Sequence, residues 1–173
     1  MKKIYFVVSF TGTILSRMVK VYTNNNYSHV SISLDKELKR MYSFGRLHPY
    51  NPILAGFVHE SPKKGTYKRF KNTVSEIYEV EITDEQYKSL EYHIMDIEKN
   101  KKKYKFNIIG LFATGVHLKI EQKYSFYCAE FVKHVLDKSS IDFNLPELIK
   151  PEDFVKIKGN KMIYQGYLRE YRW

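Results

Sequence analysis

One cysteine stands where the character of the sequence changes. Cys128 follows the aromatic run 124–127, which is typical of an extended chain, and precedes 129–136, where apolar residues have helical spacing. A thiol becomes a nucleophile when it ionises, and a helix N-terminus supplies partial positive charge that favours the thiolate. The pattern predicts a reactive thiol at a helix start, with burial of Cys128 as an ordinary core residue as the alternative.

A histidine with a suitable position occurs about a hundred residues earlier. His29 opens the segment 29–35, in which apolar residues alternate with polar ones. Such alternation predicts a half-buried strand with His29, Ser31 and Ser33 on the face opposite the apolar side chains. The pattern therefore indicates an imidazole that projects into a cleft rather than into ordinary core. The chain has no HExxH pattern, no paired Cys/His motif and no phosphate loop, so we expect neither a metal nor another cofactor.

The elements around these two residues indicate an α+β protein. We predict strands at 3–10, 29–35, 40–46 and 75–83, and helices at 11–23, 83–100 and from Cys128 onward. Thr83 and Gln86 have the spacing of a capping box. The segment 47–56, with its two prolines, is expected to be a loop. Strands and helices occur in separate runs, and a length of 173 residues predicts one domain over 1–173.

The two motifs together resemble a known family. The sequence "FYCAEF", Phe126 to Phe131, and the sequence "SHV", Ser28 to Val30, are similar to the cysteine and histidine motifs of the permuted NlpC-type papain-like cysteine hydrolases, the YiiX/YebB-like group. In that group the histidine strand precedes the cysteine helix, as it does here. The resemblance covers roughly 2–136.

The resemblance implies a papain-like fold in which the cysteine helix packs on an antiparallel sheet. It also implies a cysteine peptidase or amidase that cleaves an amide or peptide bond through a Cys–His pair and a thioester intermediate. A related branch, the lecithin:retinol acyltransferase-like enzymes, makes an acyltransferase or thioesterase on lipid-like substrates the enzymatic alternative. A basic binding module that keeps the fold without catalysis is the third reading.

Sites of this family often place a polar residue on the strand after the histidine. A hairpin register that pairs Ser31 with Ser43 puts Ser43 on the face of His29, so Ser43 is the candidate that orients the imidazole. Glu130, two residues after the cysteine, is a candidate supporting residue, and a purely structural role is the alternative.

Two further groups of residues are candidates by position. The backbone N–H of Cys128 is one expected oxyanion donor, and the loop at Thr11 and Gly12 is a possible source of the second. The segment 45–61 is expected to border the site, with Arg46, Tyr50 and Phe57 as substrate contacts and packing over an exposed edge as the alternative.

The charge and the first residues bear on partners and location. A formal net charge of +10 favours polyanionic partners. Because the lysines are spread along the chain, nucleic-acid binding is not favoured, whereas a peptide, amide or cell-wall-type substrate and peripheral membrane contact remain open. The start "MKKIYFVVSF" has the lysines and apolar run of a signal peptide, but Thr11, Gly12 and Thr13 interrupt it. We interpret it as a buried first strand and expect a cytoplasmic protein, which a single cysteine also fits.

Overall fold

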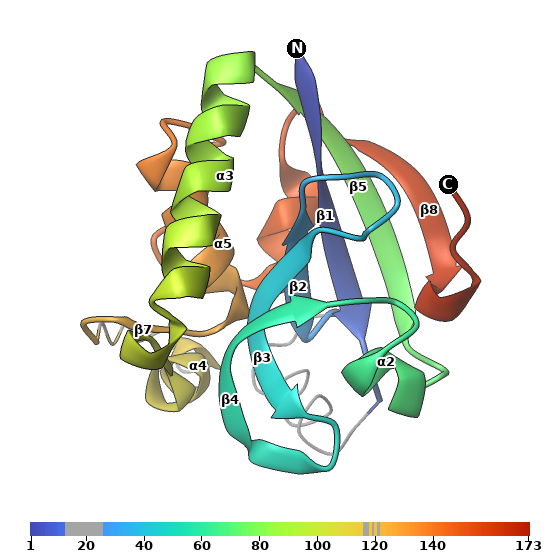
Figure 1. Cartoon of the computed structure of the whole chain (residues 1–173), viewed down its shortest axis with the longest axis vertical. Coiled ribbons are helices and arrows are strands. Elements are labelled where there is room, and N and C mark those ends of the chain that lie inside the picture. Colours follow the sequence, from blue (N-terminus) through green and yellow to red (C-terminus); the bar gives the residue numbers. More distant parts are fainter. Residues whose placement is uncertain (13–25, 116–117, 119, 121) are drawn as a thin grey trace.

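The main sheet is antiparallel and has the strand order β4-β3-β2-β1-β5-β8 (Figure 1). The computed structural model describes residues 1–12, 26–115, 118, 120 and 122–173. Within that part of the chain, the sheet consists of β1 (Lys2–Phe10), β2 (His29–Ser33), β3 (Met41–His48), β4 (Asn51–Glu60), β5 (Val74–Ile82) and β8 (Lys161–Tyr167). A short parallel ladder joins β6 (Lys105–Phe106) to β7 (Ser125–Phe126).

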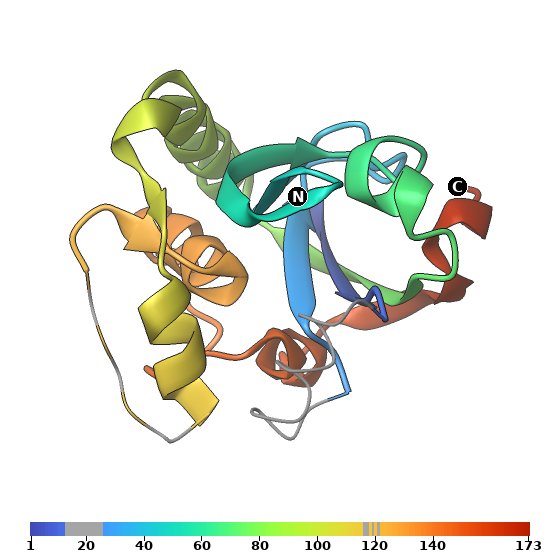
Figure 2. The same ribbon diagram turned by 90° about the horizontal axis from the view of Figure 1, so that it is seen from below.

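The helices lie on both sides of the sheet. They are α2 (Gly65–Arg69), α3 (Asp84–Lys99), α4 (Ile108–Gly115) and α5 (Cys128–Lys138), with 3-10 turns η1 (Lys101–Lys103), η2 (Pro151–Lys156) and η3 (Leu168–Glu170). Seen from below, α3, α4 and α5 lie on one side, whereas α2 and the C-terminal end lie on the other (Figure 2). The predicted α+β class is confirmed.

Strand β1 runs through the middle of the molecule, between two clusters of apolar side chains. Ile4, Phe6 and Val8 belong to the larger cluster, which includes α3 and α5. Tyr5 and Val7 belong to the smaller one, which includes Tyr67 of α2. A strand covered on both faces needs a continuous apolar run rather than an alternating one. The interpretation of the first residues as a buried strand is confirmed.

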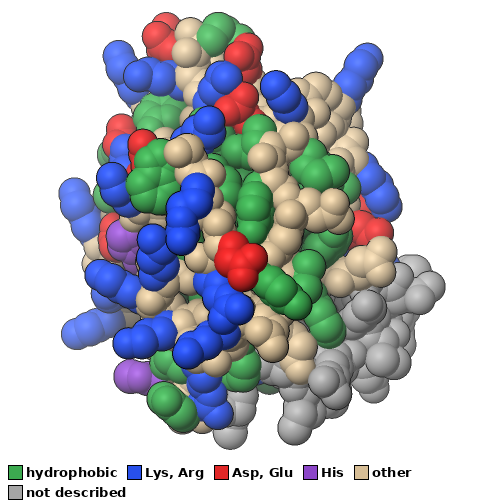
Figure 3. Space-filling view, turned by 90° about the vertical axis from the view of Figure 1, so that its right-hand side faces the viewer, with side chains coloured by type: hydrophobic (Ala, Val, Ile, Leu, Met, Phe, Trp, Pro, Cys, Tyr) green, Lys and Arg blue, Asp and Glu red, His purple; other side chains and the backbone are tan. Residues whose placement is uncertain are grey.

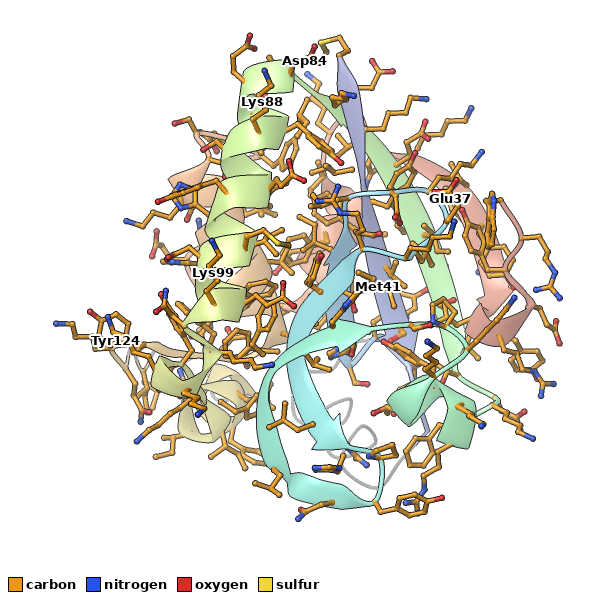
Figure 4. All side chains as sticks on the ribbon, in the orientation of Figure 1. Glu37, Met41, Asp84, Lys88, Lys99 and Tyr124 are labelled. Carbon is orange, nitrogen blue, oxygen red and sulfur yellow. The ribbon has the colours of Figure 1, made fainter. Side chains whose placement is uncertain are left out.

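Helix α3 begins where its capping residues predict. Thr83 Oγ1 accepts a hydrogen bond from the Gln86 N–H at 3.1 Å, and Gln86 Oε1 accepts one from the Thr83 N–H at 3.0 Å. This reciprocal pair satisfies two N–H groups that the helix leaves without partners. Figure 4 shows Asp84 at the start of α3 beside the amino terminus, where the terminal ammonium pairs with it at 3.1 Å.

Aromatic side chains join α5 to the sheet. Phe131 is fully buried, with its ring centroid 5.2 Å from that of Phe44 on β3 and 5.7 Å from that of Phe57 on β4. Phe44 also meets Phe126 edge-on, at 5.5 Å. Because Phe126 and Phe131 flank Cys128 in the sequence, these contacts fix the start of α5 against the strands that follow His29.

The segment 47–56 differs from the expected loop, because most of it lies in β3 and β4. Strands β3 and β4 form a hairpin whose pairing runs from Met41 opposite Glu60 to His48 opposite Asn51. Proline is tolerated in edge strands, and β4 is at the edge of the sheet, so Pro52 does not prevent strand formation. Of the predicted helix 11–23, residues 13–23 lie outside the described residues. In the part of the chain described here, no helix is long and apolar enough to cross a membrane.

The aromatic contacts predict a large effect on stability. Phe131→Ala removes a buried ring and should lower the free energy of unfolding by about 3–5 kcal/mol. The control is Tyr92→Ala, an exposed position on α3, which should change it by less than about 0.5 kcal/mol. Urea denaturation followed by circular dichroism measures both, and equal effects would show that Phe131 does not anchor α5.

Candidate active site

The start of α5 places Cys128 in the first turn of the helix. The Tyr127 N–H donates a hydrogen bond to Glu130 Oε2 at 3.0 Å, and the Phe131 N–H donates to the Tyr127 carbonyl at 3.0 Å. The Tyr127 hydroxyl also donates to the Ile149 carbonyl at 2.8 Å. These three hydrogen bonds fix the position of Tyr127, the residue before Cys128. Cys128 is only 4% exposed and forms no disulfide.

Glu130 has the structural role that the sequence left as an alternative. Besides capping α5, its Oε2 accepts a hydrogen bond from Asn107 Nδ2 at 3.2 Å. Asn107 is buried, and its Oδ1 accepts a hydrogen bond from the Gly110 N–H at 2.8 Å in the first turn of α4. A Cβ on Gly110 would lie 2.2 Å from Asn107 Nδ2, so the close approach requires glycine. Sequence reasoning missed Asn107, although an Asn before an apolar helix is a helix-start signal.

His29 lies between a carboxylate and the thiol. Its Nε2 is 3.0 Å from Glu60 Oε1, and both side chains are largely buried. The Cys128 thiol is the other group beside this imidazole that raises the His29 pKa. Because Nε2 faces Glu60, we infer that Nδ1 is the nitrogen that faces the sulfur. The structure thus brings together the cysteine and the histidine that the sequence singled out.

Glu60 is a partner of His29 that sequence reasoning missed. It is the last residue of β4, and its Oε2 accepts hydrogen bonds from the Ser31 hydroxyl and, at 3.4 Å, from the Tyr67 hydroxyl. The Tyr67 hydroxyl is also 3.4 Å from Ser9 Oγ. A charged residue that ends an apolar run was the available signal, but the expected loop at this segment obscured the partner strand.

The charges of this group stabilise one another. Burial lowers the pKa of His29, but the charge of Glu60 and the hydrogen bonds to Cys128 and Glu60 outweigh it and raise the pKa well above its usual value. Burial raises the pKa of Glu60, but the charge of His29 and the hydrogen bonds from His29, Ser31 and Tyr67 lower it overall. An imidazolium beside a carboxylate is therefore the favoured state.

The predicted orienting role of Ser43 is wrong. The register pairs Ile32 with Tyr42 and Ser33 with Met41, so Ser43 lies across from Ser31, as the expected register had it. However, its buried hydroxyl donates a hydrogen bond to the Val30 carbonyl at 2.7 Å. Glu60 holds the imidazole instead. Strand β4 supplies the group that orients the imidazole, whereas the prediction considered only β3.

Gly45, two residues after Ser43, provides space for the imidazole. A Cβ at this position would lie 3.2 Å from His29 Cε1, 3.7 Å from Glu60 Oε1 and 3.7 Å from Val58 Cγ1. A Cβ so close would require the His29 ring to shift, and the Glu60 pair limits where it can go. The side chain that is absent at Gly45 therefore helps to set the position of His29.

The predicted substrate contacts lie in different surroundings. Phe57 is buried among aromatic rings of the core, so its predicted contact with substrate is wrong. Arg46 lies with its guanidinium 5.6 Å from the ring of Phe70, and Tyr50 is exposed at the hairpin turn. Their contact with a substrate stays a prediction.

Thr11 and Gly12 follow directly after β1. Ser9, two residues before Thr11, pairs with His29 across β1 and β2. Gly12 has a φ of +68°, a conformation that glycine adopts without strain. Thr11 and Gly12 therefore follow the end of β1 that lies beside His29, at the start of β2. Their role as oxyanion donors stays a prediction.

A groove of about 800 Å³ runs along the outer side of α5. Its lining includes Tyr104, Phe126, Lys133 and His134, together with Glu130. Cys128, His29 and Glu60 do not line it, so this groove is separate from the thiol. Among the residues that the structure describes, no three His, Cys, Asp or Glu side chains are grouped as ligands of a metal ion would be.

Comparisons with known proteins add no identification. No family model, no curated protein and no solved structure matches the chain. The function proposed below therefore rests on the contacts of Cys128, His29 and Glu60.

The space at Gly45 leads to a prediction about the thiol. Gly45→Ala should displace the His29 ring and slow alkylation of Cys128 by iodoacetamide at neutral pH by about tenfold to a hundredfold. Overpacking should cost only about 1–3 kcal/mol of stability, so the variant can be measured folded.

Gly56→Ala on the neighbouring strand is the matched control, because a Cβ there meets only Leu47, at 3.8 Å. The alkylation rate of this control should equal that of the wild type. If both alanine variants react at the wild-type rate, the position of the His29 ring does not govern the thiol.

Proposed function

We propose that this protein is a cysteine-dependent hydrolase that cleaves amide or ester bonds, with Cys128 as nucleophile and His29 as general base and acid. The observation that carries the proposal is the position of one buried imidazole between Glu60 and Cys128. A nucleophile, a base in contact with it, and a third group that orients the base form the arrangement by which thiols are activated. Glu60 is the orienting group in this proposal, in place of Ser43.

The first half of the reaction forms a thioester. In the proposed resting state the Cys128 thiol has already transferred its proton to His29, and the thiolate attacks the carbonyl carbon of the substrate. The carbonyl π electrons move to oxygen, and the tetrahedral intermediate collapses with cleavage of the bond to the leaving amine or alcohol. His29 gives its proton to that leaving group, while Glu60 stabilises the imidazolium that exists between the two transfers.

The second half releases the acid and restores the enzyme. A water molecule gives a proton to His29 as its oxygen attacks the thioester carbonyl. The carbon–sulfur bond breaks, the carboxylic acid leaves, and His29 keeps the proton beside the Cys128 thiolate, which restores the starting pair. An amine or alcohol in place of water would transfer the acyl group, so acyl transfer differs from hydrolysis only in the acceptor.

The helix start supplies one stabilising dipole for the oxyanion. The first N–H groups of an α-helix have no partner within the helix, and they point toward its N-terminal end. The backbone N–H of Cys128 is in this position and is the proposed first oxyanion donor. The loss of such a donor costs about 2.7–4 kcal/mol of transition-state stabilisation in a known protease. The proposed second donor is in the segment at Thr11 and Gly12.

The order of elements supports a finer assignment of the fold. The histidine strand β2 precedes the cysteine helix α5 in the chain, and α5 packs against β2 and β3. This arrangement agrees with the permuted NlpC-type papain-like fold that the two motifs resemble. We propose that fold for the chain, with peptides, small amides or cell-wall-type peptides as the substrate class.

The test uses an activated ester and reads the covalent intermediate. Incubation with p-nitrophenyl acetate should give a burst of p-nitrophenolate that is stoichiometric with the protein, and intact-mass spectrometry should show acetylation at Cys128. Cys128→Ser should remove the burst, because a serine hydroxyl is far less acidic than a thiol. His29→Ala should reduce the burst rate by about 10²–10⁴-fold, the usual contribution of general acid–base catalysis.

Two conservative variants separate the roles of the polar neighbours. Glu60→Gln keeps the shape of the side chain and removes its charge, so the burst should slow strongly. Within the described part of the chain, the Ser43 hydroxyl bonds to the Val30 carbonyl, so Ser43→Ala should leave the burst rate within about twofold. Acetylation that persists in Cys128→Ser, or a burst unaffected by His29→Ala, would refute the proposed mechanism.

A further inference from the structure

The tip of the β3–β4 hairpin exposes large apolar side chains close to the site. Leu47 is 47% exposed, Leu54 is 50% exposed, and Tyr50 at the turn is 81% exposed. The turn reaches the lower end of the molecule (Figure 1). Single exposed apolar residues are ordinary on protein surfaces, but three within eight residues of one hairpin tip form a local group.

Cations surround this tip. Arg69, at the end of α2, donates a hydrogen bond from Nη1 to the Pro49 carbonyl at 3.1 Å, and its guanidinium lies 4.0 Å from the centre of the Tyr50 ring. Arg46 and Arg69 lie on the ring of Phe70, at 5.6 and 5.2 Å from its centre. Burial, followed by the charge of Arg69, lowers the pKa of Arg46, which shows that the two guanidinium groups repel each other. An anion beside them would relieve that repulsion.

The charge of the whole region is one-sided. Between Leu38 and Ser75 the chain carries five lysines and three arginines, and its one acidic residue is Glu60, which is buried in the site. Figure 3 shows the same asymmetry, since Lys and Arg crowd the lower left of that face with few Asp or Glu among them. Apolar tips framed by cations match the interface of a bilayer, where aliphatic groups enter the acyl region and cations meet the headgroups.

We propose that the tip surface docks onto membranes that contain anionic lipid. This surface is made of Leu47, Tyr50 and Leu54 with Arg69 and Lys68, its neighbour in the last turn of α2. The side chains of the three apolar residues enter the interfacial region, and the two cations contact lipid phosphate groups. A tyrosine ring is suited to this depth, because its apolar body and polar hydroxyl fit the boundary between tails and headgroups. The proposal concerns binding only and does not depend on the hydrolase function.

Docking at this surface would place the catalytic pair next to the bilayer. Gly45 lies against the His29 ring, and Leu47 is two residues further along the same strand. Successive strand residues advance by about 3.3 Å, so the tip begins roughly 7 Å from Gly45. A protein docked by this tip would therefore meet substrates at the membrane surface.

The test is co-sedimentation with vesicles at low salt. The wild type should bind vesicles of phosphatidylcholine mixed with phosphatidylglycerol, and it should bind vesicles of phosphatidylcholine alone much more weakly. Lys68→Gln and Arg69→Gln should each weaken binding by about fivefold, the effect of one cation near an anionic surface. Tyr50→Ser with Leu54→Ser should also weaken binding several-fold, and added salt should weaken the binding of the wild type.

Helix α3 offers matched controls at a distance from the tip. Figure 4 shows Lys88 on the upper part of α3, and Tyr92, one turn further, is 67% exposed. Lys88→Gln and Tyr92→Ser change the same residue types and should leave vesicle binding unchanged. Equal losses in the tip variants and the α3 variants would show non-specific attraction by net charge and would overturn the proposal.

Other occupants of the tip give different results. If the wild type fails to bind anionic vesicles, or binds both vesicle types equally, the proposal is wrong. Binding to inorganic phosphate or to a DNA duplex without binding to vesicles would assign the tip to a soluble anion or to nucleic acid instead. A dimer in size-exclusion chromatography that the Tyr50→Ser, Leu54→Ser variant dissociates, without vesicle binding, would assign the tip to a second copy of this chain.

Discussion

A buried ion pair at one end of the sheet determines how the site is built. His29 and Glu60 come from strands that are not neighbours, and their side chains meet at 3.0 Å with little access to solvent. Removing two charges from water is costly, and the cost is offset only if geometry is good and the remaining hydrogen bonds are made. The hydroxyls of Ser31 and Tyr67 donate those bonds to the Glu60 carboxylate. This role accounts for the buried position of Tyr67, which comes from α2.

The same constraint explains features far from the thiol in sequence. Glycine at position 45 leaves room for the imidazole, because a Cβ there would lie only 3.2 Å from His29 Cε1. On the other side, Asn107 and Glu130 tie the starts of α4 and α5 together, so the cysteine is presented by a fixed helix end. The site is rigid on both sides: the histidine is held by charge, and the cysteine by helix capping and aromatic packing. Preorganisation of this kind lowers the cost of reaching a reactive geometry.

Local sequence patterns predicted the parts of the fold that depend on local physics. The capping box at Thr83, the buried first strand and the helix that begins at Cys128 follow from spacing and residue type alone. Alternation also predicted that His29 and Ser31 share a face, but the expected half-buried strand was wrong, because Ser31 and Ser33 are fully buried along with the apolar face of β2. The approach of His29 to Cys128 was predicted from motif order, which encodes a family arrangement rather than a local preference.

The remaining site residues depend on contacts that spacing does not encode. Glu60 is next to His29 only because β4 pairs with β3 in a register fixed by the whole hairpin, and the two prolines near its turn favoured a loop. Ser43 was placed opposite the correct partner residue, but a hydroxyl also finds acceptors in the backbone, and Val30 supplied one. Asn107 joins the starts of α4 and α5, two helices whose residues are far enough apart in the sequence that no local pattern pairs them.

The most direct test of this account is the titration of the His29 imidazole by NMR, with the signal assigned among the six histidines by its loss in His29→Gln. Wild-type His29 should titrate well above its usual pKa of about 6.5. Glu60→Gln should lower that pKa strongly, because burial then acts without the opposing carboxylate charge. Cys128→Ala should also lower it, because the thiol beside the imidazole contributes to raising the His29 pKa. A wild-type pKa near the usual value that neither substitution changes would contradict the buried charged pair and the activation of Cys128 that depends on it.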